Sequence, residues 1–286
     1  MDWSKKLQEP TFWLMAIATA IAVLHLTLAS RIEESDIFAT SLLFWFAAGT
    51  LIWDHRHQLD FHSGLFPSLV GAIVLALGLT RLTFSPDSAS MAWGFPFLAA
   101  LSLGLLASGF KGLRQYWKPL LIFGVLAVQP LLVLTLQAID LSELTAKAAS
   151  FNLSYLGFHP QRETTYIYLP ASRTQVYGAC SGLQSILQLL SISVLFLLMF
   201  PLRNLWQRGL CVIAAVLIAF FVNSFRVALM AILNNAGNKP AFDFWHEGDG
   251  SLIFSAIAVA VFGGFCWLAF LRAAAPKPDP KLEDHA

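Results

Sequence analysis

Long apolar stretches separated by short polar connections make up almost the whole chain. A helix needs about 20 predominantly apolar residues to cross a bilayer, and eight stretches approach that length. The pattern therefore predicts an all-α polytopic membrane protein with about eight transmembrane helices and a small outer-face loop or hairpin. The predicted spans are roughly 12–30, 37–53, 65–80, 91–109, 119–139, 177–200, 210–235 and 251–271.

Composition supports this interpretation. Hydrophobic residues account for 57% of the 286 positions and charged residues for only 12%, which does not fit an ordinary soluble domain. The formal net charge is +1, and no block of Lys and Arg is present, so we expect no nucleic-acid partner. The first span follows Lys5 and Lys6 as a signal peptide would, but another span follows closely and we expect it to be retained.

Basic residues predict the orientation. With eight spans, the side that holds both termini carries eleven Lys and Arg, whereas the opposite side carries six. The positive-inside rule then places both termini in the cytoplasm of a bacterial inner membrane and the loops 140–176 and 236–250 outside, in the periplasm. The inner set is Lys5, Lys6, Arg56, Lys111, Arg114, Lys118, Arg203, Arg208, Arg272, Lys277 and Lys281.

Four parts are expected from this topology. Residues 1–140 would form five N-terminal transmembrane helices that act as a scaffold, and 141–176 a periplasmic loop. The stretch 163–169 is rich in β-branched and aromatic residues and ends before a Pro-Ala-Ser break, which favours a small hairpin. Residues 177–272 would form a three-helix catalytic part, and 273–286 a cytoplasmic tail.

Two features of the scaffold could suggest chemistry but have simpler explanations. The second loop contains His55, His57, Asp60 and His62, which are metal-ligand types, yet the histidines lack the i, i+4 spacing of a helical metal site. We interpret it as a solvated loop, with a metal site as the alternative. His25 lies within the first span and is expected to be a packed or hydrogen-bonded helix residue.

Polar residues concentrate in the last three spans. In the sixth, Cys180, Gln184, Gln188 and Ser191 fall at i, i+4, i+8 and i+11 and would form one stripe down one helix face, with Ser181 beside it. Such a stripe must face other helices or water. For the two glutamines, hydrogen bonding between helices is the simpler explanation.

The seventh span carries Asn223 and Arg226 on one face. Arg226 is about nine residues from the outer end of the span, roughly 13 Å deep at 1.5 Å per residue. An arginine there costs at least about 2.5–3.5 kcal/mol, and spans six to eight offer no acidic partner. Arg226 is therefore expected to be functional. His246, with carboxylates next to it in sequence, lies in the outer loop that follows.

The topology brings Cys180, Arg226 and His246 to one level of the membrane. A thiolate can attack a peptide carbonyl, an imidazole can accept and return the proton, and a cation can stabilise the oxyanion. Cys211 and Cys266 lack such neighbours and are expected to be inert packing residues. The three cysteines match neither a zinc site nor a disulfide framework.

At these positions the sequence resembles the exosortase/archaeosortase family, most closely its cyanobacterial members. The matching pieces are ACSGLQS at 179–185, NSFRVAL at 223–229 and HEGDG at 246–250, and the resemblance covers about 163 to 260. It implies a membrane cysteine protease or transpeptidase with Cys180 as nucleophile, Arg226 as transition-state stabiliser and His246 as acid/base. Supporting roles are expected for Asn223, Ser181 and Gln184.

The same resemblance implies the partners. They would be secreted proteins whose C-terminal signal, of the PEP-CTERM type, combines a short motif, a hydrophobic helix and a basic tail. The enzyme would form a thioester and pass the acyl group to an acceptor that the sequence does not identify, in a setting such as exopolysaccharide export. No cofactor or metal is expected.

Two rival functions stay open. In a transporter or channel, Arg226, Asn223 and Gln184 would line a polar path for an anionic solute. A membrane acyltransferase would use His246. Both rivals predict that Cys180→Ala is tolerated, whereas the transpeptidase hypothesis predicts loss of activity.

Overall fold

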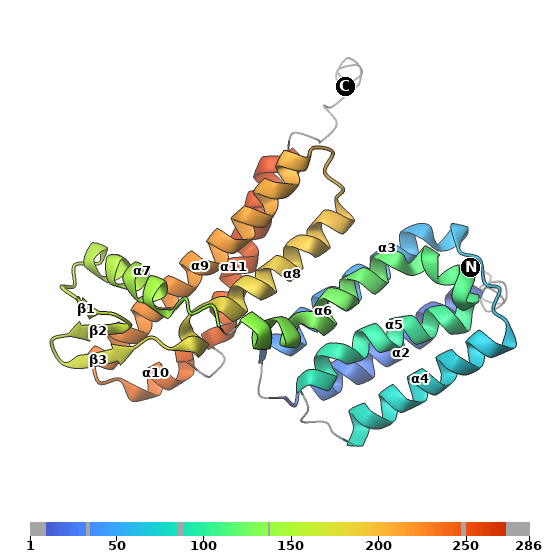
Figure 1. Ribbon diagram of the computed structural model, residues 1–286, viewed down its shortest axis with the longest axis horizontal. Helices are drawn as coiled ribbons and strands as arrows, with labels where there is room; N and C mark the ends of the chain where they lie inside the picture. Colours follow the sequence, from blue (N-terminus) through green and yellow to red (C-terminus); the bar gives the residue numbers. More distant parts are fainter. Residues whose placement is uncertain (1–9, 33–34, 85–88, 137, 247–249, 273–286) are drawn as a thin grey trace, which may run out of the picture.

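Apolar helices make up most of the structure, a computed structural model that describes residues 10–32, 35–84, 89–136, 138–246 and 250–272 (Figure 1). Within these residues, seven segments are long and apolar enough to cross a membrane, and the longest, Ala89–Leu136, contains two helices. The seven segments thus correspond to the eight predicted spans, and the polytopic all-α fold is confirmed. The expected tail, 273–286, lies outside the described residues.

The long helices extend further than the pattern predicted at several ends, because helices continue beyond the apolar region into polar residues. They are α2 (Pro10–Ala29), α3 (Ser35–His55), α4 (Leu65–Phe84), α5 (Ala89–Gly112), α6 (Trp117–Leu136), α8 (Leu183–Met199), α9 (Leu205–Asn235) and α11 (Gly250–Cys266), with short helical turns at Arg56–Gln58, Leu113–Tyr116 and Trp267–Leu271.

Helices α2 to α6 form one group, drawn on the right of Figure 1. Glycines allow α4 to approach α5 closely, since a Cβ at Gly71 would lie 2.8 Å from the carbonyl oxygen of Ser102. Helix α5 is kinked near its end at Gly109, whose φ of 65° is a conformation that favours glycine, and the turn Leu113–Tyr116 then leads into α6. The two helices then pack side by side.

His25 completes a hydrogen bond that helix α5 cannot make by itself. Pro96 lies inside α5 and has no N–H, so the carbonyl of Ala92 lacks its usual partner one turn later. The Nε2 atom of His25 lies 2.8 Å from that carbonyl oxygen, and the indole N–H of Trp45 donates to Nδ1 of His25 at 3.2 Å. The neutral imidazole therefore carries its proton on Nε2, and the prediction of a hydrogen-bonded packing residue is confirmed.

The second group contains α8, α9 and α11, which lie at the centre of Figure 1. One hydrophobic cluster extends through both groups, from Phe44 of α3 to Phe262 of α11. Gln188 of α8 also donates a hydrogen bond of 2.9 Å to the hydroxyl of Thr40 in α3, and both side chains are buried. The predicted bonding between helices is thus confirmed for Gln188.

The segment 141–176 is more ordered than a loop with a hairpin. Its first half forms the helix α7 (Ser142–Tyr155), which the sequence reasoning missed. Its second half forms a three-stranded antiparallel sheet in the order β1 (Gln161–Glu163), β2 (Tyr166–Leu169) and β3 (Ser172–Gln175), so the expected hairpin is present with one added strand.

The small sheet packs on α7 and on the C-terminal end of α9. Ile167 and Leu153 are fully buried between these elements, and each such side chain stabilises the fold by about 1.5–3 kcal/mol. At the sheet's edge, the side-chain amide of Asn234 donates to the Arg173 carbonyl at 3.2 Å, and the backbone N–H of Ala171 donates to Asn235 Oδ1 at 2.9 Å. The sheet is thereby fixed to α9.

The connection after α9 also contains an unexpected helix. Residues 236–250 were predicted as an irregular loop, but Lys239–His246 forms the short helix α10. It is amphipathic, and Trp245 packs edge-on against Phe254 of α11 with ring centroids 5.6 Å apart. Glu247 and Asp249, the carboxylates next to His246 in sequence, lie outside the described residues.

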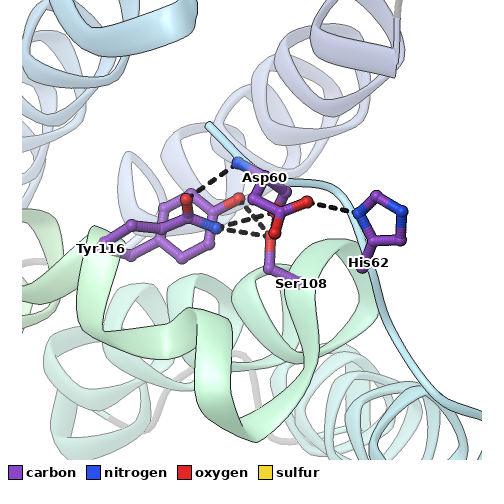
Figure 2. Close-up of polar contacts among 5 residues, drawn as sticks. Asp60, His62, Ser108 and Tyr116 are labelled. Carbon is purple, nitrogen blue, oxygen red and sulfur yellow. Dashed lines mark hydrogen bonds and ion pairs between the residues drawn. The ribbon is translucent and has the colours of Figure 1, made fainter. Parts of the chain in front are cut away.

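The second loop is a structural junction. Ser108 and Gln115 donate hydrogen bonds to the carbonyl oxygen of Asp60 at 2.5 and 2.9 Å, and the Asp60 carboxylate pairs with His62 (Figure 2). No cluster of three or more metal-ligating side chains occurs among the described residues. The loop therefore connects α3–α4 to the α5–α6 turn, and the alternative of a metal site finds no support.

Candidate active site

Cys180 lies just before α8, in a short 3₁₀ turn formed by Gly178–Cys180. The predicted stripe through Cys180, Gln184, Gln188 and Ser191 is therefore wrong at its first member. Gly182 adopts a φ of 86° and separates the turn from the helix, so the helical spacing does not extend back to the cysteine. The thiol is only partly buried, at the N-terminal end of a 17-residue helix.

The backbone around Cys180 is held by Asn223 of α9. The side-chain amide of Asn223 donates a hydrogen bond of 3.0 Å to the carbonyl oxygen of Cys180. Only glycine permits this approach, since a Cβ at Gly182 would lie 2.7 Å from Nδ2 of Asn223. Asn223 is 4% exposed, so the bond is shielded from water.

Helix α7 holds the next residue. The hydroxyl of Thr145 donates a 2.8 Å hydrogen bond to the carbonyl oxygen of Ser181, and the Ser181 hydroxyl donates to the carbonyl of Gly178 at 2.7 Å. Asn152 of α7 also donates to Ser224 of α9 at 3.0 Å. The two carbonyls at 180 and 181 are thus fixed by two different helices, which orients the cysteine.

His246 ends α10 and faces the cysteine. Its Nε2 atom lies 3.6 Å from Cys180 Sγ, within hydrogen-bonding reach for sulfur, and 3.3 Å from the hydroxyl of Tyr177. Phe242, one helical turn earlier, stacks on the imidazole with ring centroids 5.2 Å apart. The imidazole is therefore oriented by an aromatic face and a hydroxyl, and a thiol–imidazole pair of this geometry can form a nucleophilic thiolate.

Arg226 reaches the same site from α9. Its Nη2 atom donates a 2.6 Å hydrogen bond to the backbone carbonyl oxygen of His246. Its Nε is buried and has no hydrogen-bond partner among the described residues. Arg226, Asn223 and Ser251 also line a cavity of about 20 Å³, which has room for a single water molecule.

The structure thus brings together Cys180, Arg226, His246 and Asn223, with Ser181 in the supporting turn. Gln184 is not part of this group, because its side chain is exposed on α8 and makes no hydrogen bond among the described residues. No contact of Gln184 among the described residues supports a role for it in the site.

Sequence reasoning missed Tyr177, Thr145 and Phe242. Phe242 is four residues before His246, a spacing that predicts contact once α10 is known to be a helix. No sequence pattern around Tyr177 indicates its contact with His246, because the two residues come together only when the chain folds. Thr145 lies on α7, whose start is marked by Asp140, which accepts a 2.9 Å hydrogen bond from the backbone N–H of Ser142.

The other two cysteines lie far from this group in the fold. Cys211 and Cys266 are 0% and 1% exposed and belong to the hydrophobic cluster shared by the long helices. Their surroundings are those of packing residues.

Comparison with protein families decides the class. The family described as transmembrane exosortase matches residues 30–263, most of the chain. The chain belongs to the transmembrane exosortase family. No match was found among curated proteins or among solved structures.

As an exosortase, the chain is a membrane-embedded sorting transpeptidase, and the family acts on membrane-associated proteins that carry C-terminal sorting signals. The match also extends well beyond 163–260, where the resemblance was detected from sequence, and includes most of the N-terminal helices. Those helices are therefore part of the exosortase unit rather than an unrelated addition.

Proposed function

We propose that this exosortase cleaves C-terminal sorting signals through a thioester on Cys180, with His246 as acid/base. The observation that supports the proposal is the 3.6 Å separation between Cys180 Sγ and His246 Nε2, two residues 66 positions apart in the chain. Transfer of the thiol proton to the imidazole gives a thiolate, which attacks the peptide carbonyl. The carbon–nitrogen bond breaks as His246 returns the proton to the departing amine.

The second half of the reaction releases the acyl group. Water or an acceptor nucleophile loses a proton to His246, attacks the thioester, and expels the Cys180 thiolate. Arg226 contributes positive charge next to the site and fixes the backbone of His246 through its 2.6 Å hydrogen bond. We assign it the stabilisation of the oxyanion in both tetrahedral intermediates.

The proposed orientation places this site at the periplasmic face and both termini in the cytoplasm. Lys and Arg favour that orientation. In Figure 1, α7, the strands and α10 gather at one end of the molecule, and the connection between α3 and α4, which contains Arg56, lies at the opposite end. A substrate helix would pack against α8, α9 and α11 with its basic tail inside, which would bring its motif to Cys180.

The motif around Cys180 supports a cyanobacterial type of exosortase, and the class of substrate suggests a role in surface sorting linked to exopolysaccharide export. Residues 1–140 would act as the scaffold and 177–272 as the catalytic part. Helix α7 and its Thr145 would belong functionally to the catalytic part, since they hold the cysteine's turn.

A co-expression experiment tests the proposal. The protein is produced with a candidate substrate bearing motif, hydrophobic helix and basic tail, and cleavage is followed by gel mobility. Wild type should shift the substrate and yield a hydroxylamine-sensitive covalent adduct, whereas Cys180→Ser should do neither. Cys211→Ala is the matched control, because it removes a buried thiol outside the site and should retain cleavage. An adduct that persists in Cys180→Ser would overturn the assignment.

The rival transporter function is less well supported. Its polar path required Gln184, which is exposed, and the cavity beside Arg226 measures about 20 Å³. Substrate cleavage that depends on Cys180 would separate the two functions, because a transport path does not need the thiol.

A further inference from the structure

A laterally open apolar groove lies on the N-terminal helices. Its volume is about 520 Å³, and the described residues that line it come from α2, α3, α5, α6 and the turn Leu113–Tyr116. Val23 of α2 and Phe46 and Trp53 of α3 form its exposed wall, each more than half exposed. The proposed active site lies on other elements, so the groove is separate from the cysteine.

Polar hollows adjoin the groove at one end. Tyr116 and Pro119 line both the apolar groove and a small hollow of about 60 Å³, which Lys118 also lines. Gln115 in turn lines that hollow and a third, open one of about 560 Å³. The three spaces are therefore neighbours that share lining residues, from an apolar wall to a polar surface at the end of the helices.

The polar end is cationic. Lys111 and Arg114 line the third hollow, and Lys118 lines the second. Two carboxylates lie nearby: Asp54 at the end of the groove and Asp60, whose carboxylate is paired with His62 (Figure 2). Arg56 adds a further cation, with its guanidinium carbon 4.3 Å from the centre of the Trp53 ring. Cations therefore outnumber the carboxylates.

We infer that this groove and the adjoining hollows bind an anionic phospholipid. An acyl chain matches the long apolar wall, and a phosphate headgroup matches the cationic hollows at its end. Trp53 and Trp117 lie at the same end, where amphipathic rings favour the membrane interface. A substrate helix fits this groove poorly, because its basic tail would meet Lys111, Arg114 and Lys118.

Gly49 provides a precise test of the apolar part. It lines the groove, and a Cβ at this position would meet no heavy atom within 4 Å, so a large side chain can enter the groove without a clash at its Cβ. Gly264 of α11 has equally open surroundings but does not line the groove. Gly49→Phe should therefore displace an acyl chain, and Gly264→Phe should not.

The experiment compares lipids retained by the purified full-length protein. Wild type, Gly49→Phe and Gly264→Phe are exchanged into equal mixtures of phosphatidylglycerol and phosphatidylcholine, and bound lipid is measured by native mass spectrometry. Wild type and Gly264→Phe should retain phosphatidylglycerol preferentially, and Gly49→Phe should lose it. Equal retention of the two lipids by wild type, or retention by Gly49→Phe equal to that of Gly264→Phe, would overturn the inference.

Charge variants test the headgroup end without changing the groove. Lys111→Gln with Arg114→Gln should reduce the preference for phosphatidylglycerol by about fivefold for each cation removed. Lys147→Gln on α7 is the control and should leave the preference unchanged.

Inorganic phosphate alone should not raise the thermal midpoint of the protein. If phosphate reproduces the stabilisation given by the lipid, or if a substrate helix crosslinks into the groove, the site does not bind phospholipid.

Discussion

The Nη2 atom of Arg226 lies 2.6 Å from the backbone carbonyl oxygen of His246. A guanidinium inside a membrane-spanning helix costs at least about 2.5–3.5 kcal/mol, and among the described residues the hydrogen bonds of Arg226 lead to His246 rather than to a carboxylate. The bond connects α9 to the end of α10. Its effect is to hold the imidazole of His246 close to Cys180.

Arg226→Gln should lower cleavage by at least about 100-fold, because it removes both the positive charge and the bond to His246. Arg226→Lys should retain part of the activity, since it keeps the charge but cannot reproduce the planar guanidinium. The thermal midpoint of Arg226→Gln should not fall, because removing a membrane-embedded cation removes its insertion cost. A rate for Arg226→Gln within twofold of wild type would rule out this role.

Gly182→Ala should disrupt the turn that carries Cys180. A left-handed φ costs a non-glycine residue about 1–2 kcal/mol, and the added Cβ would displace Asn223 from the Cys180 carbonyl. We expect a lower thermal midpoint and a cleavage rate reduced by more than the stability loss explains. Gly178→Ala is the matched control in the same turn, where a Cβ meets nothing within 4 Å. If the two variants have the same thermal midpoint and the same cleavage rate, the close approach of Asn223 to Gly182 is not needed for the turn.

Tyr177→Phe tests the hydroxyl that contacts His246 Nε2 at 3.3 Å. Loss of one hydrogen bond of about 1 kcal/mol should reduce kcat about fivefold and leave KM unchanged, because the bond orients the imidazole and does not bind substrate. Rates should be measured over a range of pH, where a positioning role appears as a changed profile. Tyr155→Phe, at an 87% exposed position on α7, should change neither constant. A change confined to KM would instead assign Tyr177 to substrate binding.

A double-mutant cycle between His25 and Pro96 tests the repaired hydrogen bond in α5. His25→Phe should destabilise the protein because it leaves the Ala92 carbonyl without a donor. The same change in a Pro96→Ala background should cost less, since the alanine introduced there supplies a backbone N–H to that carbonyl. The expected coupling is about 0.6–1.7 kcal/mol in unfolding free energy. Additive effects of the two changes would mean that Pro96 and His25 are independent.

Much of the fold could be predicted from hydrophobicity alone. Each span is long and apolar enough to indicate its own secondary structure, because a helix is the only element of that length that satisfies its backbone in lipid. Candidate residues of the site could also be predicted, since an arginine within an apolar span has a high free-energy cost of insertion and therefore indicates a function. Helices α7 and α10 were missed because they are short, lie outside the apolar stretches and have weaker patterns.

The sequence by itself determined the membrane class and the approximate spans, and it marked Cys180, Arg226 and His246 as candidate site residues. The length of an apolar stretch and a polar residue within it are local properties of the chain. Only the tertiary structure decided that Gly182 interrupts the helix after Cys180, that Gln184 is exposed and that Tyr177 contacts His246. These relationships depend on distances between α8, α9 and α10, and the periodicity of one helix carries no information about its neighbours.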